Sequence, residues 1–545
     1  MTKLQMPVRI VTSGGEVRYP ENLLIPKVQQ AGFGAVAREM TVLTEGSFVV
    51  LDFGRELRGG IALTAGYPEG DEIVVHSEDR LRVVFGESVM EALSSIGYKN
   101  ATNEHAIRDT VLDMPHMGNL FYGNTGFRFV KLEAVHGDIT LKAVRATLDM
   151  RDIEPIGSFT CSDERLNRIY ETGAYTVYLN MGEYVWDGVK RDRLVWLGDM
   201  HPECATIYAV YGADESIRRS LDLVKAETPS DAWINTLPSY SFWWVVLQCE
   251  QYLRTGDLAY LAEQVDYMEA VLRRGLAIAR EDPSPAHFDF FVDWSSNADR
   301  DAARVGFYAV VYKAFAAAKE SFSALRRDDL VALCDEGMAA VRAVPLTVPN
   351  QKQMAGLAAY VGLIDPRVAN ETVLARDPYA GLSTFMGYYV LQARALAGDM
   401  KGALDVMRTY WGAMLDLGAT TFWEDFDIDW VKGAARIDEV TPDGMTDVHG
   451  DYGKFCYTQF RHSLCHGWAG GPTAFLAEYV LGIRVSAPGC RRLTIRPDLG
   501  DLTFARGTYP TPLGTVTVAH TRESDGRITT TFDAPEGIEV VVEGA

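Results

Sequence analysis

Hydrophobic and polar positions alternate in short segments over the first 155 residues. Residues 127–135 alternate with period two, which is the pattern of a half-buried strand. Residues 47–53 and 73–76 are short runs rich in strand-forming side chains, and the pair Gly59 and Gly60 supplies a turn signal. These patterns predict an antiparallel β-sandwich over residues 1–155.

The spacing of apolar side chains becomes helical from about residue 156. Apolar positions recur three, four and seven residues apart within 166–177 and again within 258–272. Further helical stretches are expected near 300–320, 328–343, 383–398, 401–417 and 458–481. Strands and helices do not alternate, which argues against a parallel α/β sheet. Many helices in one domain over 156–482 allow an α/α barrel or a solenoid, and no fixed-period repeat supports the solenoid.

The last segment returns to strand patterns. Runs at 492–497, 514–520 and 527–532 are rich in β-branched residues. They predict a small antiparallel β-sandwich domain over 483–545, which should pack on the helical domain. The expected fold is therefore multidomain and mainly α, with β-domains on both sides of a helical domain.

Composition narrows the class of protein. The chain has 545 residues, and its 52 basic and 74 acidic side chains give a formal net charge of −22. So acidic a surface repels phosphate backbones, which argues against nucleic-acid binding. No apolar run is long enough to span a membrane, and the N-terminus lacks the apolar core of a signal peptide. Seven scattered cysteines without a CxxC pair suggest neither a disulfide framework nor a zinc site. A cytoplasmic location is expected, and a periplasmic one stays open.

Acidic and aromatic residues cluster at five places that could carry chemistry. The densest cluster is 184–203, with three Asp, two Arg, one Lys and two Trp. Further clusters lie at 239–244, 290–297, 420–427 and 461–472. Carboxylates and Arg hydrogen-bond sugar hydroxyls, while aromatic faces stack on sugar rings. A structural salt-bridge network beside core tryptophans is the alternative explanation. The repeated pairing of acids with tryptophans favours a carbohydrate pocket, and no GxSxG, P-loop or HExxH motif points elsewhere.

The order of these clusters resembles the α-L-rhamnosidases of glycoside hydrolase family 78. That family carries a segment D-x-x-x-R-D-E-R-x-x-W-x-G-D, then a W-E pair, then a histidine. Here the matching segments are 187–199, Trp423-Glu424 and Cys465-His466. The stretch 291–294 looks like the family's sugar-binding D-W, and 51–54 and 495–497 look like its flanking β-domains. The resemblance implies an (α/α)6 barrel flanked by β-sandwiches, and inverting hydrolysis of rhamnosides.

One departure from the family motif concerns the general acid. The family has R-D-E-R, whereas this chain has Arg191-Asp192-Arg193 and lacks the glutamate. We expect Asp192 to donate the proton, although the two flanking arginines oppose this unless they point to other acids. Glu203 is a second candidate for the acid.

The remaining roles follow from the resemblance. Glu424 is expected to be the general base. The expected substrate-binding residues are Asp187, Arg191, Trp196, Asp199, Trp243, Asp293, Trp294, Trp423 and His466. No metal or other cofactor is expected. The expected partner is a small carbohydrate, a rhamnoside, with no nucleic acid and no membrane, and a homodimer is possible in principle. Two alternatives remain: an (α/α)6-barrel glycosidase for another deoxy sugar or a uronic acid, and an inactive carbohydrate-binding homologue.

Overall fold

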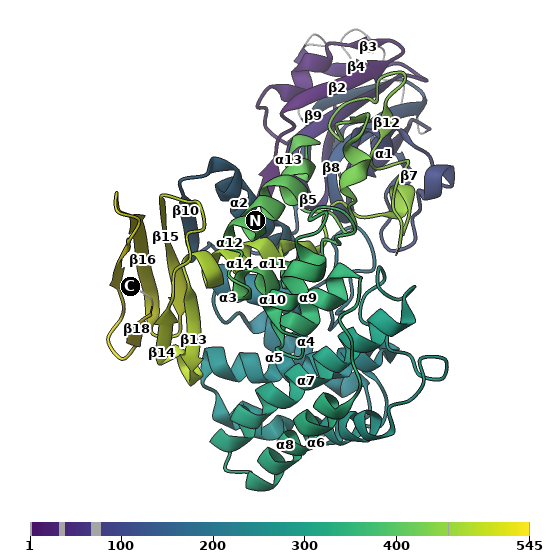
Figure 1. Cartoon of the computed structure of the whole chain (residues 1–545). Helices are drawn as coiled ribbons and strands as arrows, with labels where there is room; N and C mark the ends of the chain where they lie inside the picture. Colours follow the sequence, from purple (N-terminus) through teal and green to yellow (C-terminus); the bar gives the residue numbers. More distant parts are fainter. Residues whose placement is uncertain (1–2, 32–38, 67–77, 456, 544–545) are drawn as a thin grey trace.

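The computed structural model describes residues 3–31, 39–66, 78–455 and 457–543. Figure 1 shows an N-terminal β-domain at one end, a helical domain in the middle, and a smaller β-domain against the side of the helices. Helices account for 40% of the chain, so the fold is mixed rather than mainly α as predicted. The difference arises because the two β-domains contribute long strands to both ends of the sequence.

The described residues of the N-terminal domain form one antiparallel sheet of nine strands. The prediction of antiparallel strands is confirmed, but the strands form a single hydrogen-bonded sheet rather than two separate ones. The long strands β5 and β8 pair along most of their length, and register shifts interrupt β5 near residues 52–61. The predicted strand at 73–76 lies outside the described residues. The strands are β1 (Lys3–Gln5), β2 (Arg9–Gly14), β3 (Val17–Arg18), β4 (Thr41–Leu43), β5 (Phe48–Ala65), β6 (Arg80–Gly86), β7 (Asp109–Asp113), β8 (Gly118–His136) and β9 (Ile139–Leu148).

A short helix, α1 (Val89–Leu93), follows β6 and faces the helical domain. Ser88 caps it by accepting a hydrogen bond from the Glu91 amide, as a serine at the N-cap does. The backbone amide of Val89 donates to the carbonyl of Ile437, at 2.9 Å. The N-terminal domain therefore reaches the helical domain at the end of β6.

The helical domain contains the predicted long helices close to their expected bounds. Its larger helices share one hydrophobic core with buried tryptophans, including Trp243 and Trp411. The predicted helix at 458–481 is wrong in its first half, because 459–470 form 3-10 turns and extended backbone around a glycine-rich stretch. The helices are α2 (Glu164–Asn180), α3 (Met200–Val210), α4 (Glu215–Glu227), α5 (Pro238–Thr255), α6 (Leu258–Glu281), α7 (Arg300–Ala324), α8 (Asp328–Ala343), α9 (Lys352–Tyr360), α10 (Pro366–Ala369), α11 (Gly387–Leu396), α12 (Met400–Val406), α13 (Gly412–Asp416) and α14 (Gly471–Phe475).

The C-terminal domain consists of two small sheets. Strand β10, which precedes the first long helix in the sequence, pairs with β15 and so belongs to this domain. Strands β14 and β18 pair in parallel, in contrast to the predicted antiparallel arrangement. The strands are β10 (Ser158–Cys161), β15 (Phe504–Thr511), β16 (Gly514–Arg522) and β17 (Ile528–Asp533) in one sheet, and β13 (Ile483–Ala487), β14 (Arg492–Ile495) and β18 (Glu539–Val542) in the other.

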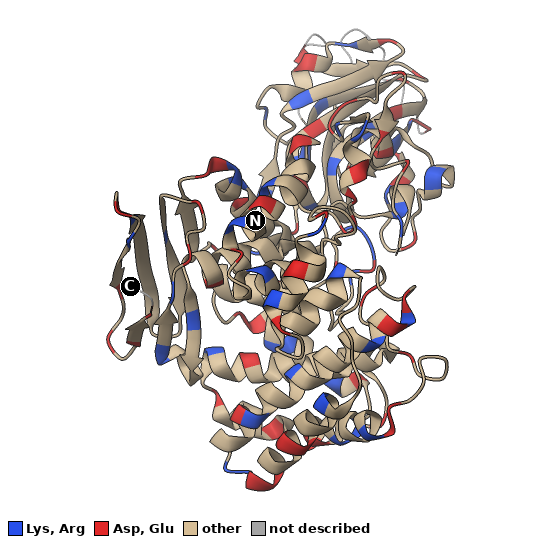
Figure 2. Cartoon of the chain, in the orientation of Figure 1, with Lys and Arg blue, Asp and Glu red and all other residues tan. Residues whose placement is uncertain are grey.

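Charges of both signs are spread over all three domains (Figure 2). The six cysteines in the described part of the chain are buried and free, and Cys456 lies outside it. Among the described residues, no helix combines the length and apolarity needed to cross a bilayer.

Candidate active site

A cavity of about 260 Å³ lies where loops of the helical domain converge. Eight of the predicted site residues line it, and they come from four separate segments of the chain. The lining residues are Asp187, Arg191, Asp192, Trp196, Asp199, Asn235, Thr236, Leu237, Tyr240, Phe291, Trp294, Glu424, Tyr457, His466 and Trp468. Such a mixture of carboxylates and aromatic rings in a concave site is typical of ligand pockets.

The segment between α2 and α3 supplies most of the charged lining. Gly188 forms an isolated antiparallel bridge with His466, which brings this segment against the late loop of the domain. Asp192 and Arg193 both adopt left-handed backbone conformations, with φ of 51° and 57°. Such a backbone conformation is costly for a residue other than glycine, so the surrounding contacts must hold this turn in place.

Arg191 connects the two residues predicted to be catalytic. Its Nε donates to Glu424 Oε2 at 3.1 Å, and its Nη2 donates to Glu424 Oε1. Its Nη1 donates to Asp192 Oδ1 at 3.3 Å. The guanidinium lies over the ring of Tyr457, 3.4 Å from the centroid. One planar cation therefore orients both carboxyl groups at the same cavity, and the bidentate pair with Glu424 is the stronger one.

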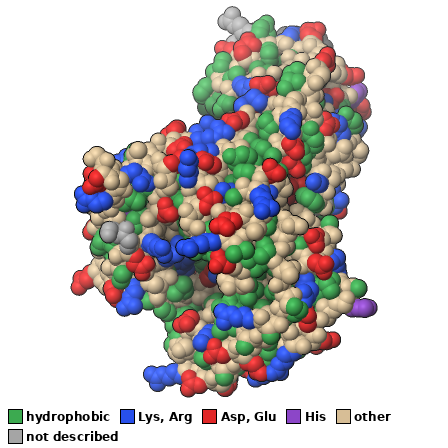
Figure 3. All heavy atoms as spheres, in the orientation of Figure 1, with side chains coloured by type: hydrophobic (Ala, Val, Ile, Leu, Met, Phe, Trp, Pro, Cys, Tyr) green, Lys and Arg blue, Asp and Glu red, His purple; other side chains and the backbone are tan. Residues whose placement is uncertain are grey.

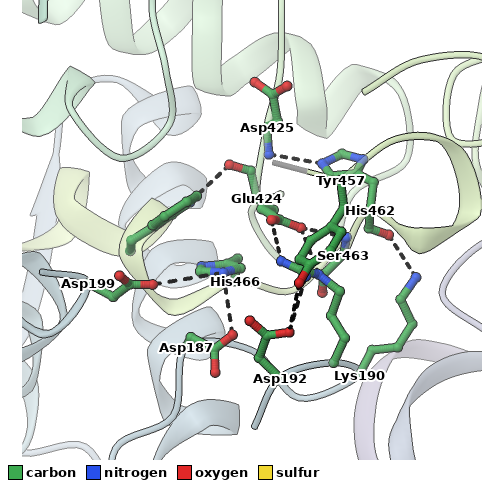
Figure 4. Close-up of polar contacts among 12 residues, drawn as sticks. Asp187, Lys190, Asp192, Asp199, Glu424, Asp425, Tyr457, His462, Ser463 and His466 are labelled. Carbon is green, nitrogen blue, oxygen red and sulfur yellow. Dashed lines mark hydrogen bonds and ion pairs between the residues drawn. The ribbon is translucent and has the colours of Figure 1, made fainter. Parts of the chain in front are cut away.

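The Glu424 carboxylate has a further donor in the backbone. Ser463 N donates to Glu424 Oε2 at 3.0 Å, and Glu424 N donates to Ser463 O at 3.0 Å. Trp468 Nε1 donates to the Glu424 carbonyl at 2.9 Å. Figure 4 shows the Glu424 side chain directed into the space between these groups.

Within the described part of the chain, three groups contact the Asp192 carboxyl group at Oδ1. Besides Arg191, the hydroxyl of Tyr457 lies 3.4 Å from this oxygen, and His105 Nε2 lies 3.3 Å from it. Arg193, which the sequence placed beside this acid, instead donates to the carbonyl and side chain of Asn124. The flanking arginines are therefore directed mainly at Glu424 and at the N-terminal domain.

Two further carboxyls and a histidine form a buried group beside the acid. His466 Nε2 lies 3.8 Å from Asp187 Oδ2 and 4.0 Å from Asp199 Oδ2 (Figure 4). Burial and the neighbouring Asp192 raise the pKa of Asp187 well above its usual value. Burial raises the pKa of Asp199 in the same way, and burial with the positive charge of Arg191 lowers the pKa of His466. Both kinds of shift favour the neutral form of the buried group, the carboxylic acid for the two aspartates and the uncharged imidazole for His466.

Three predicted site residues do not line this cavity. Trp243 is fully buried in α5, with its ring stacked near His201 and Tyr389. Trp423 is 1% exposed and packs edge-on against Phe426.

Asp293 is also buried, and it accepts hydrogen bonds from the hydroxyls of Ser295 and Ser383. Burial raises its pKa to about 6. Glu203, the second candidate for the acid, is fully buried and likewise does not line the cavity. These four side chains are therefore buried and stand outside the lining of the cavity.

Several lining residues were not singled out from the sequence. Tyr240 donates a hydrogen bond to Asp199 Oδ1 at 3.2 Å, and Trp468 packs against His466 with ring centroids 4.1 Å apart. Both lie inside the acid-aromatic clusters recognised above, in which another member was chosen. Tyr457 and Asn235 lie in stretches with no comparable signal.

One group of described side chains has the proximity of a metal site. Glu87, Glu91 and His449 are buried with ligand atoms within 4.8 Å of one another. However, the Lys190 ammonium contacts Glu87 Oε2 at 2.9 Å and Glu91 Oε1 at 3.1 Å. Lys190 thus supplies the positive charge that a metal ion would bring to this place.

Two families match parts of this chain. Residues 154–322 match the bacterial alpha-L-rhamnosidase 6 hairpin glycosidase domain, and residues 482–543 match the bacterial alpha-L-rhamnosidase C-terminal domain. An alpha-L-rhamnosidase of Alteromonas sp. (strain LOR) is 26% identical over 459 residues, covering 74% of this chain and 46% of that protein. The chain spans less than half the length of the curated relatives it matches.

Solved structures share the fold. A GH78 family rhamnosidase of Bacillus sp. GL1 has a TM-score of 0.72 at 22% identity, covering 96% of this chain and 55% of that one. A rhamnosidase from Klebsiella oxytoca with rhamnose bound has a TM-score of 0.64 at 19% identity, covering 87% of this chain and 95% of that one. The matches of residues 154–322 and 482–543 to domains of bacterial alpha-L-rhamnosidases confirm the resemblance expected from the motifs.

Proposed function

We propose that this protein is a glycoside hydrolase that removes terminal α-L-rhamnose from rhamnosides in a single inverting step. The observation that carries the proposal is the pairing of Asp192 and Glu424 around the Arg191 guanidinium, at a cavity walled by aromatic rings. Asp192 acts as the general acid and Glu424 as the general base. The catalytic domain is an (α/α)6 barrel over residues 156–482, between β-domains at 1–155 and 483–545.

The environment of Glu424 suits a general base. A base must start as a carboxylate, and the bidentate pair with Arg191 is formed by a carboxylate. An ionised carboxylate can accept about four hydrogen bonds. Arg191 and the Ser463 amide account for three of them, which leaves room for the attacking water.

The environment of Asp192 suits a general acid. Its contacts with described residues fall on Oδ1, so Oδ2 is the oxygen that carries the proton toward the leaving group. An inverting enzyme needs its two carboxyl groups about 6.5–9.5 Å apart, so that water fits on the opposite side of the sugar. The Arg191 guanidinium contacts both carboxyl groups and so holds them apart.

The shape and lining of the cavity favour a single deoxy sugar. At about 260 Å³ the cavity is small for a ligand pocket, which suits one terminal sugar ring. Trp196, Phe291, Trp294 and Leu237 offer apolar surface for the methyl group of a 6-deoxy sugar. Asp187 and Asp199 lie beside this surface and can bind hydroxyls. Two structural relatives are described as containing rhamnose, which supports the choice of sugar.

A uronic acid fits this cavity less well. Arg191 is the one Lys or Arg side chain among the described lining residues, and Glu424 already pairs with it. The Glu424 carboxylate would face the carboxylate of such a substrate across the cavity. Like charges in a site of low dielectric repel each other strongly.

The test is hydrolysis of p-nitrophenyl α-L-rhamnopyranoside beside a panel of other aryl glycosides. We expect release from the rhamnoside, and NMR of the product should show inversion at the anomeric carbon. Retention of configuration would contradict the roles of the two carboxyls. Activity on another sugar alone would overturn the choice of substrate.

The Glu424→Gln variant tests the base in the same assay. We expect kcat to fall by at least about 10²-fold while L-rhamnose still binds, because the amide cannot accept a proton from water. Asp427→Asn is a matched control three residues away, since an asparagine keeps the cap that Asp427 provides to residue 429. An active Glu424→Gln enzyme would remove Glu424 as the base.

A further inference from the structure

Glu87 is a buried carboxylate of the N-terminal domain that contacts the helical domain. It lies directly after β6 and is 1% exposed. Its Oε1 accepts a hydrogen bond from Ser463 Oγ at 3.0 Å, and its Oε2 accepts one from Leu464 N at 2.6 Å. The Lys190 ammonium lies 2.9 Å from the same Oε2. Glu87 does not line the cavity, so it touches no substrate.

Both segments that Glu87 contacts hold the Glu424 carboxylate. Ser463 donates its backbone amide to Glu424 Oε2, and its side chain binds Glu87. Lys190 precedes Arg191, whose guanidinium forms the bidentate pair with Glu424. Figure 4 shows Lys190, Ser463 and His462 on one side of Glu424. Two routes therefore connect Glu87 to the base, one through Ser463 and the other through Lys190 and its neighbour Arg191.

The contacts of Lys190 show that the ammonium joins the two domains. Besides Glu87 and Glu91, it donates to the carbonyls of Phe460 and His462, at 3.1 and 2.7 Å. Glu91 in turn accepts a hydrogen bond from the Glu87 amide at 2.8 Å. A buried charge of this kind needs several partners to offset the loss of hydration, and here both domains provide them.

We propose that Glu87 is a positioning residue for the general base, through which the N-terminal domain holds Glu424 in its reactive orientation. The proposal rests on the hydrolytic function and on the role of Glu424 given above. Hydrogen-bonded support of this kind sets the orientation of catalytic groups, and a misplacement of about 1 Å can cost 10²-fold in rate.

The variants Glu87→Gln and Glu91→Gln provide a matched test. Each removes one carboxylate from Lys190, but only Glu87→Gln disturbs Ser463 and Leu464. The glutamine amide would present a donor where three donors converge on Glu87. We expect kcat of Glu87→Gln to fall by about 10- to 100-fold with KM within about threefold of wild type. The kcat of Glu91→Gln should fall by less than about two- to fivefold, which is a third of the loss in Glu87→Gln on a logarithmic scale.

The dependence on the leaving group distinguishes positioning of the base from general damage. Glu87→Gln should lose the same factor in kcat with good and poor leaving groups, because attack by water and not proton donation is impaired. Ser463→Ala, which removes the hydroxyl contact with Glu87 together with two contacts to the Cys465 backbone, should show a smaller loss of the same kind. It serves as the test if Glu87→Gln does not fold.

The proposal fails if Glu87→Gln keeps kcat within threefold of wild type, or if Glu87→Gln and Glu91→Gln lose equal factors. Wild-type protein that is inactive on the whole panel would overturn the proposed function instead. Crystal structures of the wild type and Glu87→Gln then decide the positioning role. A Ser463 amide that stays on Glu424 in the variant would overturn it, and a displaced Ser463 or Glu424 would support it.

Discussion

At the scale of single residues, Asp192 offers the most direct test of the proposed acid. Its Oδ1 is surrounded by Arg191, Tyr457 and His105, which leaves Oδ2 for the leaving group. We expect Asp192→Asn to lower kcat/KM by about 10²- to 10⁴-fold with an alkyl rhamnoside. The loss should be much smaller with p-nitrophenyl rhamnoside, because p-nitrophenolate leaves without a proton.

The measurement is kcat/KM with both substrates for wild type and variant. Asp149→Asn is the control, since Asp149 accepts a hydrogen bond from Asn124 at the edge of the same loop but lies outside the cavity. Equal losses on the two substrates would move the acid to another group. Asp187 and Asp199, whose pKa values burial raises, would then be the next candidates.

The residue patterns indicated the region of the cavity better than they identified the side chains that line it. The clusters at 239–244 and 461–472 do contribute to the cavity, but through Tyr240 and Trp468 as well as His466. Trp243 lies three residues after Tyr240 on the same helix and points into the core. A tryptophan looks the same in sequence whether it lines a pocket or fills a core, and only packing distinguishes the two.

At the scale of elements, α2 and the glycine-rich stretch at 467–475 pack closely against each other at Gly173. A Cβ on Gly173 would lie 2.4 Å from Thr473 Oγ1 and 3.0 Å from the Gly470 carbonyl. Gly173→Ala should therefore push α2 away from this stretch, with a cost of about 1–3 kcal/mol in unfolding free energy. Because His466 and Trp468 lie at the start of the stretch, kcat should fall as well.

The measurement is thermal unfolding together with rhamnoside hydrolysis. Glu171→Ala, an exposed substitution on the same helix, is the control and should change stability by less than about 0.5 kcal/mol. A Gly173→Ala enzyme as stable and active as wild type would show that the two segments can separate without harm.

The sequence predicted elements well where one face is regularly buried. The stretches 300–320 and 328–343 correspond to α7 and α8, and 127–135 lies within β8. The helix predicted at 458–481 is wrong in its first half, because the apolar spacing continues through residues that contribute to the cavity. Glycines and polar groups there face Glu424 and Asp187 instead of completing helical turns.

At the scale of the whole molecule, the N-terminal domain lies closer to the proposed catalytic residues than its place in the sequence indicates. Glu87, His105 and Asn124 each contact the loop or segments that carry the catalytic groups. The contacts between Glu87 and Ser463 join residues 376 positions apart. No local pattern can reveal such a pairing, so the sequence predicted a flanking domain and missed its part in the site.

The charge of the molecule bears on its stability. Figure 3 shows acidic and basic side chains interspersed on one face, while the formal net charge is −22. In the interior, burial raises the pKa of Asp425 to about 7 and that of Asp293 to about 6. The same groups in the unfolded chain release their protons near pH 4.

These shifts predict that the contribution of the buried carboxyls to stability declines as pH rises from about 4 to 7. In this window these groups bind more protons in the folded protein than in the unfolded chain, so the folded state loses stability relative to the unfolded chain as pH increases. Carboxyl groups with a lowered pKa, such as Asp214 beside Arg151, stabilise the fold while they are ionised. That contribution is lost only at lower pH, when they become protonated. The Tm should fall by several degrees, and added salt should reduce only the surface part of the effect. Asp425→Asn should flatten the decline, whereas a Tm that rises toward pH 7 would contradict the buried protonated carboxyls.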